Sequence, residues 1–335
     1  MLSTNQCSTQ DLEIILTGFP GLQDIQFWIS APFFVLLVVT LFGNLTLLLI
    51  IATEQSLHEP MYYFILILSA VDLVTGLTLL PQTIAILWFG SLILCFDICL
   101  LQMFFIYFSV VMESSVLVLM AYDRYTAICN PLRYSSIITN TFILNGSLIV
   151  TVRSFCIIFP GLILFRDLPF QSKTILSNVY CEYLTVIDAA CVSSDWKDIL
   201  IFLLFILAII PDTLMIFISY YMIVSATLKL KSKVARLKAF NTCSSHFFVI
   251  LSFYLSGPLS VIIYIFQNKV PAYTRALFPV LYYSVPPALN PLIYGIRTKE
   301  IFRLVLTNAE KIKNVLYTAT GCVSTEPSEG YEDGN

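Results

Sequence analysis

Long hydrophobic stretches alternate with short polar segments along most of this chain. Seven of them contain about 20 mostly apolar residues or more, the length that an α-helix needs to cross the hydrocarbon core of a bilayer. The stretches run over Trp28–Ile51, Met61–Leu80, Cys99–Tyr122, Phe142–Phe165, Ile199–Leu228, Ala239–Phe266 and Leu277–Ile296. The pattern predicts an all-α membrane protein built as a bundle of seven transmembrane helices.

The amino-acid composition also favours a membrane location. Hydrophobic residues make up 58% of the 335 residues and charged residues only 12%, about half the charged fraction of soluble domains. This composition excludes an ordinary cytosolic enzyme, and the 26 phenylalanine and 18 tyrosine residues argue against disorder. Because the net charge is −3, no basic surface for nucleic acid is expected. The lipid bilayer is therefore an expected partner, and nucleic acid is not.

The distribution of lysine and arginine predicts the orientation of the chain. With the N-terminus outside, the cytoplasmic segments hold twelve of these residues and the outer loops hold five, as the positive-inside rule requires. Residues 1–27 contain neither lysine nor arginine, so we expect no cleavable signal peptide. The prediction is a multi-pass protein with an extracellular N-terminus.

This topology divides the chain into four regions. Residues 1–27 form the extracellular N-terminus, and residues 28–296 form the membrane domain. In residues 297–317, apolar residues recur at helical spacing among basic ones, which predicts a short amphipathic helix on the inner membrane surface. Residues 318–335 are acidic and polar, so we expect a disordered cytoplasmic tail.

Three oxygen-bearing side chains are expected near the middle of the membrane. Counted from the inner helix ends at about 1.5 Å per residue, Asp72 lies about 18 Å deep, Glu113 about 15 Å and Asn290 about 10 Å. Two carboxylates so close cannot both stay bare and ionised. Either a cation such as sodium binds between them, or they form a polar cluster that satisfies itself across the helices. No other cofactor is expected.

The inner end of the third stretch carries a specific motif, Met120-Ala121-Tyr122-Asp123-Arg124-Tyr125. An arginine at a helix end can simply snorkel to the interface, but its place after the third of seven spans makes the signal strong. Further motifs follow the same order as the spans: Gly43-Asn44, Leu57–Tyr63, Ala127–Cys129, Ser219-Tyr220, Lys238–His246 and Pro287–Tyr294. With this set the chain resembles rhodopsin-like G-protein-coupled receptors, specifically olfactory receptors.

Three segments resemble the class I, or fish-like, branch of that family: Leu16–Leu22, Met112–Ser115 and Cys129–Tyr134. The resemblance implies a plasma-membrane receptor that binds a small odorant, couples to the stimulatory olfactory G protein and raises cyclic AMP. It also implies a G-protein switch formed by Asp123, Arg124, Tyr125, Tyr220 and Tyr294, in which the sixth helix moves outward on activation.

Other functions stay open from the sequence alone. A receptor of the same superfamily for an internal metabolite would carry the same motifs. A channel or transporter is disfavoured, because no internal repeat is found and Asp212 is the only further polar candidate along a path. An enzyme is not expected, since neither His58 nor His246 has neighbours that resemble a metal site or a catalytic triad.

The family pattern pairs Cys99 with Cys181, and both are expected on the oxidising outer side. Cys191 then lacks its usual partner and Cys95 is also spare, so these two either pair with each other or stay free. The usual N-terminal glycosylation site is replaced by Asn5-Gln6-Cys7, a poor acceptor.

The ligand site is expected between the outer halves of the helices. On the third span, Met103, Ile106, Tyr107 and Val110 recur at helical spacing on one face. By family position, the residues facing them are Phe205, Tyr254, Val261, Tyr264 and Tyr283. The alternative is that this stripe is ordinary bundle core.

The chemistry of this predicted pocket bears on the ligand. Many class I receptors carry an arginine near the outer end of the sixth helix, whereas residues 261–266 here contain no cation. An ionised carboxylate would be desolvated there without compensation. We therefore expect a neutral, mostly apolar volatile such as an alcohol, aldehyde, ketone or ester.

Overall fold

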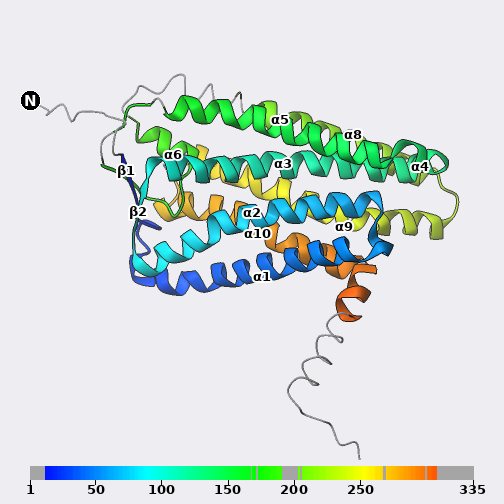
Figure 1. Ribbon diagram of the computed structural model, residues 1–335, viewed down its shortest axis with the longest axis horizontal. Coiled ribbons are helices and arrows are strands. Elements are labelled where there is room, and N and C mark those ends of the chain that lie inside the picture. Colours follow the sequence, from blue (N-terminus) through cyan, green and yellow to red (C-terminus); the bar gives the residue numbers. More distant parts are fainter. Residues whose placement is uncertain are drawn as a thin grey trace, which may run out of the picture.

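The computed structural model describes residues 12–166, 168–170, 173–190, 203, 206–266, 269–298 and 300–307, without the side chains of residues 235, 238, 242, 258, 261, 264, 265 and 297. Within these residues, seven long helices lie side by side along one axis (Figure 1). They are α1 (Gln26–Thr53), α2 (Pro60–Phe89), α3 (Phe96–Cys129), α5 (Asn140–Arg166), α8 (Ile210–Leu228), α9 (Lys233–Ile265) and α10 (Ala272–Arg297). The predicted helical bundle is confirmed.

Short elements connect the long helices. Single turns of 3-10 helix precede and follow α1, at η1 (Gln23–Ile25) and η2 (Gln55–Leu57), and η3 (Pro131–Arg133) leads into the short helix α4 (Tyr134–Ile137). At the opposite end of the bundle, α6 (Tyr183–Asp188) belongs to the connection between α5 and α8.

Several helix bounds differ from the predicted spans: α3 continues past Tyr122 to Cys129, α8 begins at Ile210 rather than Ile199, α9 begins at Lys233 rather than Ala239, and α2 is also longer. We predicted an end at Leu80, and the helix continues through Pro81 to Phe89. A proline inside a membrane helix is tolerated, because neighbouring groups satisfy the carbonyl that it leaves free. The helix stops at Gly90, which has a φ of +80° and donates its N–H to Ile86 O over 2.8 Å. Glycine adopts this left-handed cap without a steric penalty.

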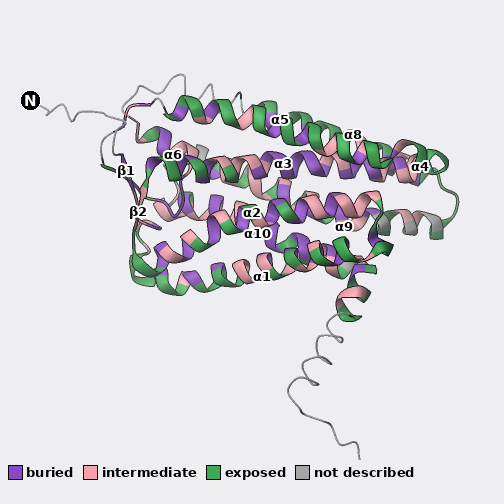
Figure 2. Ribbon diagram, viewed as in Figure 1, coloured by how far each residue is buried: buried purple, intermediate pink, exposed green. Residues whose placement is uncertain are grey.

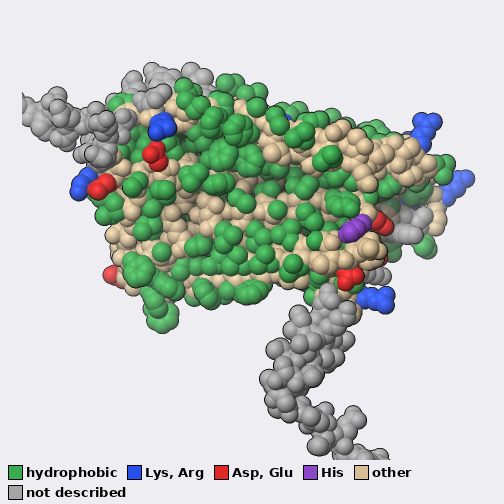
Figure 3. Space-filling model, in the orientation of Figure 1, with side chains coloured by type: hydrophobic (Ala, Val, Ile, Leu, Met, Phe, Trp, Pro, Cys, Tyr) green, Lys and Arg blue, Asp and Glu red, His purple; other side chains and the backbone are tan. Residues whose placement is uncertain are grey.

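Apolar side chains cover the middle of the bundle. Five helices of the described chain, α1, α2, α3, α5 and α8, are long and apolar enough to cross a membrane, while α9 contains a shorter apolar stretch at Cys243–Gly257. Exposed residues lie along the outward faces of the helices (Figure 2). On the visible face, hydrophobic side chains fill the middle and charged side chains lie at the two ends (Figure 3). This distribution suits a belt of lipid around the molecule.

A small sheet, which the sequence did not predict, covers one end of the bundle. Its strand order is β2-β1-β3, with β1 (Glu13–Leu16) antiparallel to β2 (Leu92–Cys95) and parallel to β3 (Lys173–Leu176). Leu12, Ile14 and Leu16 are buried in the hydrophobic core beneath it. We call this end of the bundle the sheet end and the opposite end, which carries α4, the α4 end.

Two close contacts bring α1, α2 and α10 together. A Cβ atom on Gly76 of α2 would lie 2.6 Å from Thr40 Cγ2 of α1, and one on Gly43 of α1 would lie 2.7 Å from Pro291 Cγ of α10. Both distances are too short for real atoms. Small residues at these positions therefore let the backbones approach, as in other membrane bundles.

The chain turns away from the bundle after α10. Residues 300–307 are helical, and Ile301 is buried against the core at the α4 end while Leu304 and Val305 are partly buried there. This is the beginning of the predicted amphipathic helix. The rest of that helix and the predicted acidic tail lie outside the described residues, as does Asn5.

Candidate functional site

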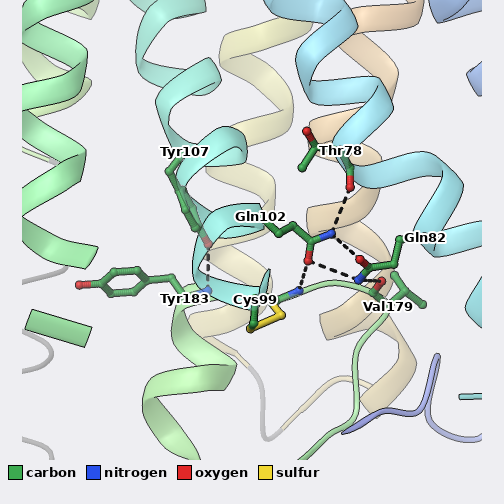
Figure 4. Close-up of a disulfide and its surroundings, with 8 residues drawn as sticks. Thr78, Gln82, Cys99, Gln102, Tyr107, Val179 and Tyr183 are labelled. Atoms are coloured by element: carbon green, nitrogen blue, oxygen red, sulfur yellow. Dashed lines mark hydrogen bonds between the residues drawn. A yellow bond between two sulfur atoms is a disulfide. The ribbon is translucent and has the colours of Figure 1, made fainter. Parts of the chain in front are cut away.

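The sheet end is held together by a disulfide and a pair of glutamines (Figure 4). Cys99 of α3 is bonded to Cys181, the predicted pairing, with the two Cα atoms 5.5 Å apart. Beside the disulfide, Gln102 Oε1 accepts the Cys181 backbone N–H over 2.9 Å. Gln102 Nε2 donates to Gln82 Oε1 over 2.9 Å and to Thr78 O over 3.1 Å. The loop after β3 is thus fixed to α2 and α3 by both covalent and polar contacts.

Cys95 and Cys191, which we predicted either to pair or to stay free, do not form a described pair. Cys95, at the end of β2, carries an exposed free thiol. Cys191 lies outside the described residues.

Aromatic side chains gather beneath this loop. The Tyr107 hydroxyl accepts the backbone N–H of Tyr183 over 3.0 Å. The Tyr107 ring meets the rings of Tyr183 and Tyr283 edge to face, at centroid distances of 6.0 and 6.1 Å. Met103 lies one helical turn from Tyr107 toward the sheet end, and Ile106 directly precedes Tyr107. Both residues are fully buried in the same core. Four of the predicted ligand residues, from α3 and α10, therefore come together here.

The remaining predicted ligand residues are placed differently or not described. Val110 and Tyr254 lie deeper, against the hydrophobic core nearer the α4 end. The side chains of Val261 and Tyr264, and all of Phe205, lie outside the described part of the chain. The ligand site as a whole stays a prediction.

The three polar residues predicted at mid-depth do meet. Asn290 Nδ2 lies 3.0 Å from Asp72 Oδ2 and 3.2 Å from Glu113 Oε1, and all three side chains are buried. The Asn290 Oδ1 atom has no hydrogen-bond partner among the described residues. Two carboxylates and an unpartnered amide oxygen are the ligand types that a hard cation prefers. The donor set therefore fits a sodium ion, and a shared proton would satisfy the same carboxylates.

A second buried polar cluster joins four helices, and the sequence analysis missed it. Arg153 Nη1 of α5 lies 3.0 Å from Asp212 Oδ2 of α8. The same carboxylate oxygen accepts the hydroxyls of Ser114 (2.8 Å) and Ser115 (3.1 Å) of α3. The Ser114 hydroxyl in turn lies 2.9 Å from the Tyr254 hydroxyl of α9. The sequence signal for this cluster was an arginine in the predicted fourth span and an aspartate in the predicted fifth span.

Arg153 also reaches the chain that leads into α8. Its Nη2 atom donates to Leu207 O over 3.0 Å and to Ala208 O over 2.9 Å. One guanidinium group therefore satisfies a carboxylate and two backbone carbonyls, a use of its planar set of donors that lysine cannot reproduce.

At the α4 end, the predicted switch residues form separate pairs. Asp123 Oδ2 accepts Arg124 Nη2 over 2.8 Å, and Asp123 Oδ1 accepts the Tyr134 hydroxyl over 2.7 Å. The Tyr220 hydroxyl lies 3.0 Å from His246 Nδ1.

Two further switch residues complete this end. Tyr294 of α10 is buried, and its hydroxyl lies 3.8 Å from Met120 Sδ. Tyr125 is partly buried, and its ring lies 6.2 Å from that of Tyr122. In this arrangement Arg124 pairs with the adjacent Asp123, and no described ion pair joins Arg124 to α9.

A groove of about 590 Å³ lies between α9 and α10, and all of its lining residues come from these two helices. Its lining is apolar apart from Ser252 and Ser256, whose hydroxyls donate to carbonyls of their own helix. None of the predicted ligand residues lines it. Its composition suits contact with lipid.

Comparisons with known proteins agree with this geometry. The family model described as olfactory receptor matches residues 33–311. Human Olfactory receptor 52H1 is 38% identical over 90% of this chain and 96% of its own length, and human Olfactory receptor 52D1 is 40% identical over 85% and 90%.

The fold of a solved structure is also similar. A crystal structure of squid rhodopsin superposes with a TM-score of 0.68 over 87% of both chains, at 16% identity. At this identity the likeness shows the fold, whereas the family model and the two human relatives show the family. This multi-pass membrane protein, which is not an enzyme, belongs to the olfactory receptor family of G-protein-coupled receptors.

Proposed function

We propose that this protein is an odorant receptor of the plasma membrane, with the sheet end and the N-terminus outside the cell. It binds a small, neutral and mostly apolar volatile between the outer halves of the helices. Binding activates the stimulatory olfactory-type G protein at the α4 end and raises cyclic AMP. Membership of the family supports a small-molecule ligand and G-protein coupling in general.

The observation that carries the proposed ligand class is the chemistry of the sheet end. The side chains around Tyr107 are apolar or phenolic, with Met103, Ile106 and three tyrosine rings in contact, and the buried polar residues nearby, Gln102 and Asn178, are uncharged. No lysine or arginine is among the fully buried residues of the described chain. A carboxylate entering this region would lose water without gaining a cation, so neutral odorants are favoured over carboxylic acids.

The route from ligand to G protein is proposed through the Arg153–Asp212 cluster. Tyr254 lies on α9, the helix that we expect to move, and its hydroxyl contacts Ser114 on α3. A ligand that shifts α9 relative to α3 changes this contact. Activation requires a ligand that binds one arrangement of α3 and α9 more tightly than the other.

We also propose that sodium binds at Asp72, Glu113 and Asn290 in the resting receptor. The purified receptor should gain thermal stability with sodium chloride relative to choline chloride. The Asp72→Asn variant should lose this difference. Equal stabilisation of the wild type by the two salts would contradict the sodium site and favour a shared proton.

The ligand class is tested with a panel of neutral volatiles and carboxylic acids of matched chain length, read out as cyclic AMP in cells that express the receptor. Neutral compounds should activate at lower concentrations than the acids. The Arg124→Ala variant should reach the cell surface and give no cyclic AMP response. A consistent preference for acids, or a full response of Arg124→Ala, would refute the proposal.

A further inference from the structure

The loop after β3 is bonded to the bundle at every second residue. Residues 179–182 form neither helix nor strand, so their buried backbone groups need partners of another kind. Three side chains of α2 and α3 bond to this part of the loop: Gln82 Nε2 donates to Val179 O (3.4 Å), Gln102 Oε1 accepts the Cys181 N–H (2.9 Å) and the Tyr107 hydroxyl accepts the Tyr183 N–H (3.0 Å) (Figure 4). The position of the loop is therefore set by these side chains as well as by the disulfide.

Gln82 and Gln102 form a reciprocal amide pair whose orientation is fixed by its other contacts. Gln102 Nε2 donates to Gln82 Oε1 over 2.9 Å, and Gln82 Nε2 donates to Gln102 Oε1 over 3.3 Å. A reversed Gln102 amide would place its NH2 group against the Cys181 N–H and its oxygen against Thr78 O, which accepts Gln102 Nε2 over 3.1 Å. Two donors or two acceptors that face each other form no hydrogen bond. The pair therefore holds the loop in one position.

Tyr180 lies between two of the bonded positions of the loop. Its side chain is fully buried, and its ring meets Tyr283 of α10 edge to face at 5.8 Å. Tyr283 in turn meets Tyr107 at 6.1 Å, so Tyr180 belongs to the group of aromatic rings at the sheet end. Because the backbone on either side of Tyr180 is bonded to Gln82 and Gln102, these two amides determine how closely the Tyr180 ring approaches α10.

We propose that Gln82 and Gln102 are positioning residues that determine which ligands the receptor accepts. They hold Tyr180 against the aromatic residues that we predict to bind the ligand, and they thereby limit the length of ligand that fits. This inference rests on the proposed odorant-receptor function and concerns the selectivity of the same site. Neither glutamine needs to contact the ligand, since both amide groups are bonded to each other and to the backbone. Longer ligands are disfavoured because they bind only if Tyr180 moves.

The first test is hydrogen–deuterium exchange of the purified receptor in lipid nanodiscs, which needs no ligand. In the wild type, the Cys181 amide should exchange slowly, because its N–H is bonded to a buried oxygen. Gln102→Met keeps the length of the side chain but removes this acceptor, so exchange in residues 179–183 should rise by about tenfold. Gln82→Met leaves the Cys181 bond in place and should raise exchange by less, about threefold.

The second test measures ligand selectivity with a series of straight-chain alcohols of increasing length, read out as cyclic AMP. In the wild type, one chain length should be clearly more potent than the longer ones. Gln102→Met should reduce the ratio of potencies between the best and the longest alcohol by about threefold to tenfold, with the maximal response retained at equal surface expression. A merely structural role would lower surface expression, or the response to every alcohol alike, and would leave this ratio unchanged.

Thr83→Val is the matched control for both tests. Thr83 follows Gln82 on α2 and is buried, but its hydroxyl donates to Leu79 O of its own helix over 2.9 Å. Valine has nearly the same shape, so the variant removes a buried hydrogen bond from α2 and none from the loop. Exchange in residues 179–183 and the potency ratio should both stay at their wild-type values.

The outcomes separate this inference from the function on which it rests. If Gln102→Met exchanges like the wild type, or exchanges faster but keeps the wild-type potency ratio, the positioning role is wrong and the odorant receptor stands. If no volatile activates the surface-expressed wild type, the proposed function fails and the selectivity role fails with it, while exchange still decides whether the pair holds the loop. Should Gln102→Met not reach the surface, Gln82→Met decides in both tests, and an unchanged potency ratio in that variant overturns the proposal.

Discussion

Removing the guanidinium of Arg153 tests whether the buried cluster stabilises the bundle. In an Arg153→Met variant, Asp212 keeps its two serine donors but loses its only cation among the described contacts, and two backbone carbonyls lose their donor. Methionine retains a long, apolar side chain at the position. The variant should therefore report on the charge and the hydrogen bonds rather than on lost volume.

The magnitude follows from the burial of the pair. Breaking a buried ion pair by removing one partner costs about 3–5 kcal/mol, since it leaves an uncompensated charge. Asp212 is 2% exposed, whereas Arg153 is 27% exposed, and the serine hydroxyls continue to solvate the carboxylate. We therefore expect a loss near the lower end of that range, about 3 kcal/mol in the free energy of unfolding.

The double variant Arg153→Met, Asp212→Leu makes the test specific. Replacing both members of a buried pair by apolar residues is often neutral or stabilising, so the double variant should be more stable than Arg153→Met alone. Such a reversal is a coupling energy between the two side chains, which a double-mutant cycle measures.

The assay is denaturant unfolding of purified receptor in lipid nanodiscs, followed by tryptophan fluorescence. Arg166→Met is the control, because Arg166 lies 4.0 Å from Asp97 and both side chains are more than 70% exposed (71% and 77%). Exposed pairs contribute about 0–1 kcal/mol, so this variant should unfold almost like the wild type. If Arg153→Met does the same, or if the two substitutions are additive, the cluster is not a stabilising unit.

Further predictions follow from other contacts. Asp123→Asn removes the charge that holds Arg124, so basal cyclic AMP should rise severalfold at equal surface expression, and an unchanged basal level would contradict a restraining role. Gly76→Leu forces a side chain against Thr40 and should destabilise the bundle by about 1–3 kcal/mol, which would be seen as lost surface expression. Gly90→Leu tests the glycine that caps α2 separately.

The sequence predicted the contacts that depend on how deep each residue lies along its helix. A helix rises by a fixed distance per residue, so counting placed Asp72, Glu113 and Asn290 at similar depths, and the structure brings them within hydrogen-bond distance. The disulfide followed from the family pattern. Neither the depth of the three polar residues nor the disulfide pairing required knowledge of how each helix is rotated about its axis.

The contacts that were missed depend on that rotation. In a membrane protein, lipid-facing and core-facing positions are both apolar, so hydropathy does not show which face of α5 meets α3. Arg153 and Asp212 are charged residues within predicted spans, but their pairing required α5 to lie against α3 and α8. The Gln82–Gln102 pair was invisible for the same reason. The three strands were missed because each has only four residues, too few for a clear alternation.

Helix α3 contributes side chains to each of the polar clusters described above. Gln102 and Tyr107 contact the outer loop, Ser114 contacts the Arg153–Asp212 cluster and Tyr254, and Asp123 holds Arg124. In the proposed mechanism, α3 is the fixed reference against which other helices shift. The Ser114–Tyr254 contact joins α3 to α9 through one hydroxyl pair, whereas Cys99 and Gln102 fix α3 to the loop at several points. We propose that a ligand at the sheet end displaces α9 by exchanging this hydrogen bond, while the disulfide and Gln102 continue to hold the loop. Because α3 is joined to the loop at several points but to α9 through one hydroxyl pair, a small molecule can favour one of two arrangements of α9 against α3.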